Sequence, residues 1–244
     1  MTDRAQEEKP EQRRVLEDVL DEVLSFNYRS LRTLRDIFLR PGTVARTFLS
    51  GDRDTYTPTM RVWFGVLTWM FVLSMIWGGW GEIIWRASSD GAAFGDALHE
   101  GRRDVGAVRD AISTMAALIY VPIEALLIPP GLLVLRAMRN SVNRLHATQC
   151  YFIPITATAV SSTLVLLAST IWPGILQWGM VLNMSVFVLV AIPVVRTGFA
   201  SAWPGAIGKS LVLALVVLAL SMIARISTLL ISIFWALGQV PPTG

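Results

Sequence analysis

Two charged side chains stand inside long apolar stretches of this 244-residue chain. Glu124 lies near the middle of the run at about 111–135, and Arg225 lies near the middle of the run at about 210–237. A charge at the centre of a bilayer costs about 2.5–3.5 kcal/mol on insertion scales, so both residues are candidates for an intramembrane polar site. One interpretation is an ion or proton pathway beside a proline-broken helix. The other is a buried Glu–Arg pair, or a protonated Glu124 bonded to a neighbouring helix, without transport.

Asn183 is a third polar residue within an apolar run, although a single amide often bonds only the facing helix. His146 and Cys150 lie four residues apart, a spacing at which two metal ligands share one helical turn. Cys150 is the only cysteine and His99 is the only other histidine, so we predict neither a metal site nor an intrachain disulfide. The sequence contains no Walker loop, nucleophile elbow, His-Glu-x-x-His motif or glycine-rich dinucleotide turn. We therefore predict no cofactor and no catalytic residue.

A short motif before the first apolar run concentrates groups that bind phosphate. It extends from Gly51 to Pro58. The candidate lipid-headgroup contacts in and around it are Arg46, Arg53, Tyr56 and Arg61. Guanidinium groups bind phosphate through paired N–H donors, and a tyrosine ring favours the headgroup layer. The alternative is a connector that anchors the first crossing by generic snorkelling of its arginines.

The composition explains which elements must position these residues. The chain is 53% hydrophobic and 16% charged, more apolar than soluble domains at about 45–50%. A transmembrane helix needs about 20 mainly apolar residues, and five runs reach roughly that length: 62–80, 111–135, 151–171, 174–195 and 210–237. The second run is interrupted by Pro122, Pro129 and Pro130. Four crossings are the alternative, if the run around Arg225 breaks.

Residues 1–59 are expected to form a cytoplasmic region with amphipathic helices, ahead of a transmembrane domain at 60–244. An acidic amphipathic pattern occupies 15–24. The charge then reverses, and four arginines accompany the apolar residues: Arg29, Arg32, Arg35 and Arg40. Such a helix can lie in the membrane interface. We expect Pro41 to end it, and the following turns to be closed by Gly51.

The distribution of basic residues predicts the orientation. With five crossings, the amino-terminal segment and the loops at 136–148 and 196–209 share one side and carry most of the short-loop arginines and lysines. The polar loop at 81–110 is slightly acidic. The positive-inside rule then predicts a bacterial inner-membrane protein with a cytoplasmic amino terminus and a periplasmic carboxyl terminus. Membrane lipids are the expected partners, a protein partner or self-association stays open, and nucleic acid is excluded for want of a basic soluble domain.

A set of short motifs carries a resemblance to a known family. They are Thr33-Leu34, Pro41-Gly42, Gly51-x-Arg53, Tyr56-x-Pro58 and, more loosely, the segment 122–126. The chain resembles an uncharacterised bacterial family of multipass membrane proteins, which is distantly similar to the Yip-type five-helix proteins of eukaryotic trafficking. The likeness covers about 25–165 and is specific over 31–58. Many members look to carry an amino-terminal zinc ribbon, which this chain lacks, and the family implies a topology without an activity.

Together these patterns predict an all-α polytopic membrane helix bundle of non-enzymatic type. We expect a scaffold or accessory protein that contacts lipid headgroups or a protein partner through its amino-terminal region. The alternative is a small transporter or channel that uses Glu124 and Arg225 beside the proline-broken helix. A membrane enzyme acting on lipid ranks third, because no nucleophile, metal set or acid–base pair supports it.

Overall fold

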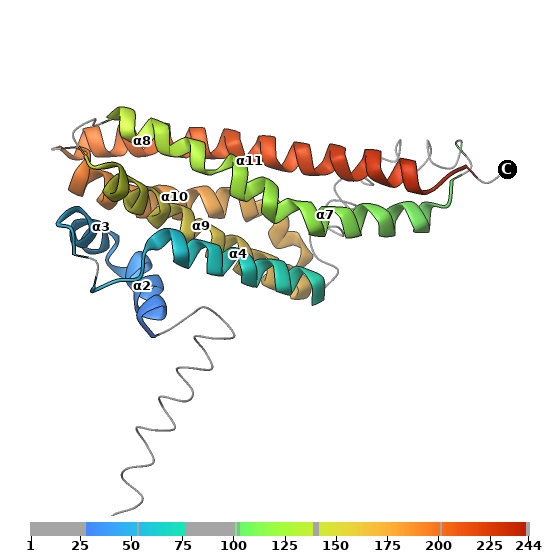
Figure 1. Cartoon of the computed structure of the whole chain (residues 1–244), viewed down its shortest axis with the longest axis horizontal. Helices are drawn as coiled ribbons and strands as arrows, with labels where there is room; N and C mark the ends of the chain where they lie inside the picture. Colours follow the sequence, from blue (N-terminus) through green and yellow to red (C-terminus); the bar gives the residue numbers. More distant parts are fainter. Residues whose placement is uncertain are drawn as a thin grey trace, which may run out of the picture. The chain divides into compact units, whose positions relative to one another are not determined.

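The computed structural model describes residues 28–52, 54–76, 101, 103–138, 142–200 and 202–242. Every regular element in this part of the chain is a helix (Figure 1), which confirms the predicted all-α class. The acidic helix expected at 15–24, Arg53 and most of the loop at 81–110 lie outside the described residues. Two compact units are formed, the first by Met1–Leu67 and Leu132–Ala214, the second by Thr68–Gly131 and Leu215–Gly244.

The first unit begins with two short helices, α2 (Tyr28–Leu39) and α3 (Pro41–Leu49). Arg40 leaves the helical region, with φ −143° and ψ 50°, because a residue before proline avoids the α conformation. Pro41 then occupies the first turn of α3, where its missing N–H is not needed. Gly51 follows α3 with a φ of 83°. The predicted break at Pro41 and the predicted glycine after α3 are both confirmed.

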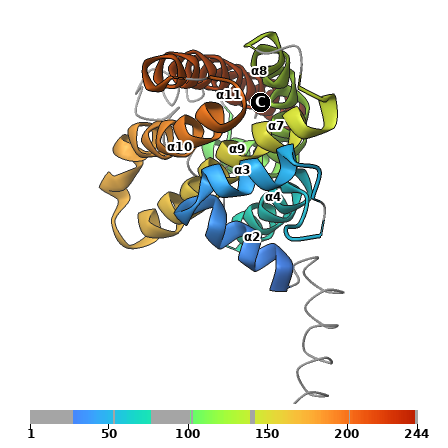
Figure 2. The ribbon, with the colours of Figure 1, turned by 90° about the vertical axis from the view of Figure 1, so that its left-hand side faces the viewer.

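Two long helices form the body of the first unit: α9 (Arg144–Ile171) and α10 (Leu176–Gly198), joined by the short turn η2 (Pro173–Ile175). Helix α3 packs against both of them, and α2 packs against α3 and α9 (Figure 2). The unit also contains α8 (Leu132–Met138), the start of α4 (Thr59–Ile76) and the start of α11 (Trp203–Gln239). The rings of Trp63 and Phe152, 4.8 Å apart, join α4 to α9.

The second unit is built around α7 (Val105–Leu127), which runs beside the later part of α11 (Figure 1). The Asp104 side chain caps α7 by accepting hydrogen bonds from the backbone N–H groups of Gly106 and Ala107, at 2.8 and 3.3 Å. Val108 and Ile112 bury their side chains against Ala236 of α11. This packing fixes the pairing of the two helices.

Within the described ranges, four helical segments are long and apolar enough to cross a membrane: Val105–Met138, Arg144–Ser169, Leu176–Gly198 and Trp203–Gln239. The chain is therefore compatible with an integral membrane protein. The first of the five predicted runs, 62–80, corresponds to α4, whose apolar part Thr59–Leu73 is shorter. Four crossings were the expected alternative if the run around Arg225 were broken. That condition is not met, because α11 continues through Arg225 without a break.

The second predicted run, at about 111–135, differs from the structure in where the helix begins and in where it is interrupted. Helix α7 begins at Val105 rather than at about 111 because the Asp104 cap starts it earlier. Pro122 lies inside the continuous helix. The interruption comes at the short turn η1 (Pro129–Gly131), where two successive prolines remove two backbone donors.

Candidate functional site

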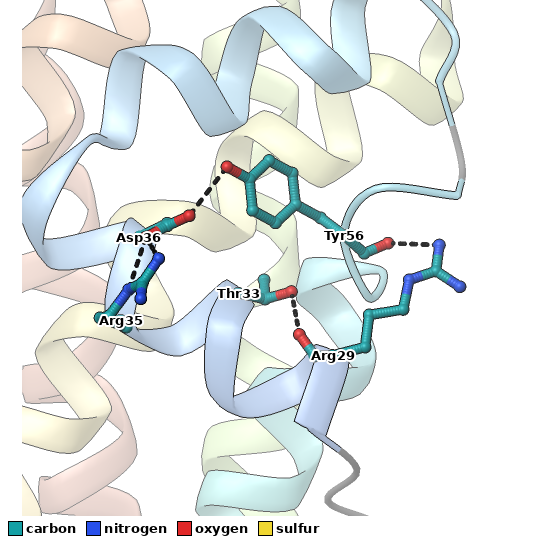
Figure 3. Close-up of polar contacts among 5 residues, drawn as sticks. All are labelled: Arg29, Thr33, Arg35, Asp36 and Tyr56. Atoms are coloured by element: carbon teal, nitrogen blue, oxygen red, sulfur yellow. Dashed lines mark hydrogen bonds and ion pairs between the residues drawn. The ribbon is translucent and has the colours of Figure 1, made fainter.

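An aspartate buried on α2 organises the N-terminal module, by which we mean residues 28–59. Asp36 is 4% exposed, and the Tyr56 hydroxyl donates to its Oδ2 at 2.9 Å (Figure 3). The Arg35 Nε donates to Oδ1 at 2.9 Å, and a second Arg35 nitrogen forms an ion pair with the same oxygen at 2.8 Å. Both carboxylate oxygens are thus bonded, as a buried charge requires.

The pKa values of Asp36 and Tyr56 follow from their surroundings. Burial raises the pKa of Asp36, but the hydrogen bonds from Arg35 and Tyr56 and the charges of Arg35 and Arg32 outweigh it, so the pKa lies below its ordinary value. Burial, and then the bond to Asp36, raise the pKa of Tyr56. At neutral pH a charged carboxylate therefore faces a protonated phenol, which makes the bond charge-assisted.

Small hydroxyl side chains join the loop before α4 to the buried face of α2. Thr33 Oγ1 accepts from the backbone N–H of Thr57 at 2.9 Å and donates to the Arg29 carbonyl at 2.8 Å. Ser30 Oγ donates to Thr57 Oγ1 at 3.2 Å. The Arg29 guanidinium donates to the Tyr56 carbonyl at 3.0 Å, as Figure 3 also shows. The backbone carbonyl of Tyr56 and the backbone N–H of Thr57 thus each have a hydrogen-bond partner on α2.

The N-terminal module is bonded in turn to α9. Thr59 donates its backbone N–H to Gln149 Oε1 at 2.6 Å and its hydroxyl to the Gln149 carbonyl at 2.6 Å. Cys150 is fully buried, with its sulfur 4.0 Å from the Ala45 carbonyl oxygen. Cys150 thus packs between α9 and α3. In the described part of the chain, no three histidine, cysteine, aspartate or glutamate side chains gather as metal ligands would.

Two glycines let α3 approach α10 closely. A Cβ atom on Gly42 would lie 3.3 Å from Thr197 Oγ1, and one on Gly198 would lie 2.7 Å from a Leu49 methyl carbon. Of the family-like motif residues, Thr33, Gly42, Gly51 and Tyr56 therefore each have a structural task. The motif holds a helical module against membrane-length helices.

The predicted headgroup contacts fall into two groups. Arg46 on α3 and Arg61 on α4 are exposed. Tyr56 is 4% exposed and its hydroxyl is bound by Asp36, so it holds the module together instead of facing lipid. The sequence reasoning missed Asp36. Its signal was an isolated acid in an arginine-rich helix, three residues after Thr33 and on the same face.

The predicted intramembrane residues lie in both units. In the second unit, the Tyr120 hydroxyl donates to Glu124 Oε1 at 2.7 Å, and the positive charge of Arg225 acts on both groups. The side chain of Arg225 is itself exposed. Asn183 belongs to the first unit, where its amide nitrogen donates to Ser162 Oγ at 2.8 Å and bridges α10 to α9. The structure thus groups Glu124 with Arg225 and places Asn183 elsewhere.

A model of the family described as "Protein of unknown function (DUF3667)" matches residues 29–71. This stretch holds all of α2 but its first residue, all of α3 and most of α4. It contains the motifs between Thr33 and Pro58 on which the resemblance rested, but not the looser segment 122–126. No curated protein and no solved structure matches the chain. The chain is therefore similar to this family over its N-terminal module, and the match carries no activity.

Proposed function

We propose that this chain is a membrane-embedded scaffold or accessory protein of non-enzymatic type whose N-terminal module binds lipid headgroups. One observation carries the proposal: the outer face of α2 exposes large apolar side chains beside arginines. Leu31 is 53% exposed and Leu39 is 70% exposed. Arg32 is exposed on the same short helix, and Arg40 is exposed directly after its end.

This face suits the boundary between headgroups and acyl chains. Apolar surface left in water costs roughly 25 cal/mol per Å², and a helix that lies in the interface removes that cost. Each arginine near an anionic surface adds about 1 kcal/mol of attraction. Arg46 and Arg61 extend the exposed basic surface onto α3 and α4, and Arg53 is proposed to contribute from the loop between them.

The test uses the purified full chain with phosphatidylglycerol or phosphatidylcholine, and counts retained lipids by native mass spectrometry. Replacing Leu39 and Arg40 together by glutamine should lower phosphatidylglycerol retention roughly fivefold, the equivalent of about 1 kcal/mol. Arg144→Gln is the matched control, since this exposed arginine starts α9 outside the module. Unchanged retention in the double variant would refute the headgroup role. Loss of a co-purifying protein instead of lipid would favour a protein partner on this face.

We further propose that α4 crosses the membrane as a fifth helix of a bacterial inner-membrane protein. The amino terminus would then be cytoplasmic and the carboxyl terminus periplasmic, as the positive-inside rule favours. A carboxyl-terminal alkaline phosphatase fusion should be active, and a matching green fluorescent protein fusion should be dark. The opposite pattern would place the carboxyl terminus in the cytoplasm and would refute this topology.

A second candidate function, a small transporter or channel, is favoured by one specific observation. The Tyr120–Glu124 hydrogen bond and the nearby charge of Arg225 form a polar cluster within two apolar helices, and such clusters mark ion paths. Proteoliposomes should then show a proton flux that Glu124→Gln abolishes and Asp110→Asn, at an exposed acid of α7, leaves intact. A folded Glu124→Gln variant with unchanged flux would exclude this role.

A further inference from the structure

A second basic feature of the first unit lies outside the N-terminal module. It is a cleft of about 750 Å³ between the end of α10, the start of α11 and the last residue of α8, which we name the α10–α11 cleft. Its size falls within the range of ligand sites, about 300–1,000 Å³. Arg196 and Lys209 supply its charge, and Met138, Ala200 and Ala202 supply apolar lining.

Both cationic groups are held in place by neighbouring atoms. The Lys209 ammonium donates to the carbonyls of Phe199 and Met138 at 2.7 and 3.2 Å, which uses two of its three donors. The Arg196 guanidinium lies over the Trp203 ring, 3.9 Å from its centroid. The contact with the ring holds the guanidinium in place, and the N–H donors of a guanidinium lie in its plane.

Among the residues that the structure describes, none that lines the cleft carries a negative charge to balance these two cations. The sequence after Glu124 contains no aspartate and no glutamate, so α8, α9, α10 and α11 cannot supply one. A site with two preorganised cations and no acid favours an anion as its occupant.

The backbone adds to the same preference. Helix α11 begins at Trp203, and Gly205 of its first turn lines the cleft. The first N–H groups of a helix have no partner in its own ladder, and the helix dipole is positive at that end. Pro204 has no N–H and Ala206 donates to the Ala202 carbonyl, so the groups of this turn that an anion can use are the N–H groups of Trp203 and Gly205. Gly205 has no side chain to cover them.

We propose that the α10–α11 cleft binds a phosphate group, and that an anionic phospholipid headgroup supplies it. The cleft lies where two membrane-length segments, Leu176–Gly198 and Trp203–Gln239, meet in sequence. Trp203 stands at this end, where interfacial tryptophans are enriched. The apolar lining residues Met138, Ala200 and Ala202 suit the glycerol and first methylenes of a lipid. This site is separate from the outer face of α2 and does not depend on it.

The test measures binding of phosphatidylglycerol, phosphatidylcholine and inorganic phosphate to the purified full chain in neutral detergent. Native mass spectrometry and thermal stabilisation serve as the two readouts. Arg196→Gln should weaken phosphatidylglycerol binding roughly tenfold, the size expected when one charge-assisted bond is lost. Arg196→Lys should retain part of the binding, because the charge stays while the in-plane donors are lost. Lys209 is left unchanged because it also binds two backbone carbonyls.

Two controls separate this site from other basic surfaces. Arg144→Gln removes an exposed arginine at the start of α9 that does not line the cleft, and should leave binding unchanged. The Leu39→Gln and Arg40→Gln double variant should remove a different set of lipids from the one that Arg196→Gln removes. Equal binding by wild type and Arg196→Gln would overturn the site. Saturable binding of inorganic phosphate without preference for phosphatidylglycerol would overturn the lipid assignment in favour of a soluble phosphate compound.

Discussion

The N-terminal module and the later part of α11 use buried hydroxyl groups in opposite ways. In the N-terminal module of the first unit, Thr33 and Tyr56 are buried and both are bonded to other parts of the module. On α11 in the second unit, the hydroxyls of Thr228 and Ser232 are fully buried and have no hydrogen-bond partner among the described residues. Since unpaired buried groups cost free energy, the hydroxyl bonds stabilise the N-terminal module, whereas the hydroxyls of Thr228 and Ser232 are a cost to α11.

Removing the Tyr56 hydroxyl should destabilise the N-terminal module more than the other substitutions described below. Tyr56→Phe leaves one oxygen of a buried carboxylate without its donor, which costs about 2 kcal/mol for a bond to a charged group. Amide hydrogen exchange in peptides covering 28–59 should then quicken roughly 30-fold. Peptides covering 105–127 should keep their wild-type rates.

Tyr28→Phe is the matched control, because Tyr28 lies on α2, the helix that carries Asp36, and is 72% exposed. It should change exchange in the module by less than about twofold, as surface substitutions do. If Tyr56→Phe behaved like Tyr28→Phe, the bond to Asp36 would not be what holds the loop to α2.

A pair of isosteric substitutions compares the regions directly. Thr33→Val removes the acceptor of the Thr57 N–H and leaves that donor buried, at a cost of about 1–2 kcal/mol. Thr228→Val removes a hydroxyl without a partner among the described residues and should be neutral or slightly stabilising. The free energy of unfolding of each variant in detergent, from denaturant titration, measures both. A larger loss for Thr228→Val would mean that its hydroxyl has a bound partner, and would end the contrast.

Local signals made part of this architecture predictable. The break at Pro41 and the glycine after α3 depend on single-residue backbone preferences, and the positions of the long helices depend on apolar length. The Tyr120–Glu124 bond joins residues four apart on one helix, a spacing at which helical side chains meet. Such features need no knowledge of the rest of the fold.

Long-range features could not be predicted in the same way. The Asp36–Tyr56 bond joins residues 20 apart, and the Thr59–Gln149 bond joins residues 90 apart. Both depend on how the loop and α9 pack, which a residue pattern does not specify. The α10–α11 cleft was missed for the same reason, since Arg196 and Lys209 were assigned only to a loop charge count. The close approach that Gly198 permits to Leu49 depends on the packing of α3 against α10, for which the sequence carries no local signal.

The backbone at Gly51 offers a smaller effect within the first unit. Gly51→Ala meets no atom within 4 Å, so only its φ of 83° opposes a side chain. The strain should cost about 1 kcal/mol. Gly208→Ala also meets no atom, but Gly208 lies inside α11 without a positive φ, so alanine there should stabilise by about 0.5–1 kcal/mol. Denaturant titration of the two variants should therefore give shifts of opposite sign. Two losses of equal size would contradict the role given to the left-handed conformation of Gly51.

The weakest expected effect is a dependence on acid. The pKa of Asp36 in the folded module lies below its ordinary value of 3.8. A group of this kind stabilises the fold fully above its unfolded pKa, and the contribution is lost as the pH falls through the folded pKa. Hydrogen exchange in peptides covering 28–59, corrected for the intrinsic effect of pH on exchange, should show unchanged protection from pH 7 to about pH 5 and a decline only below about pH 4.

Asp36→Asn should remove part of that decline without removing all of it. Asp52 also has a lowered pKa, because the Thr55 hydroxyl and the backbone N–H groups of Asp54 and Thr55 bind its carboxylate. Asp52→Asn should therefore remove a second part, and the double variant should be flat. A decline centred between pH 5 and 6 would assign the titration to other groups, because depressed carboxylates cannot produce it. Peptides covering 105–127 contain neither carboxylate and should not share this acid response, which would extend the contrast between the units to pH.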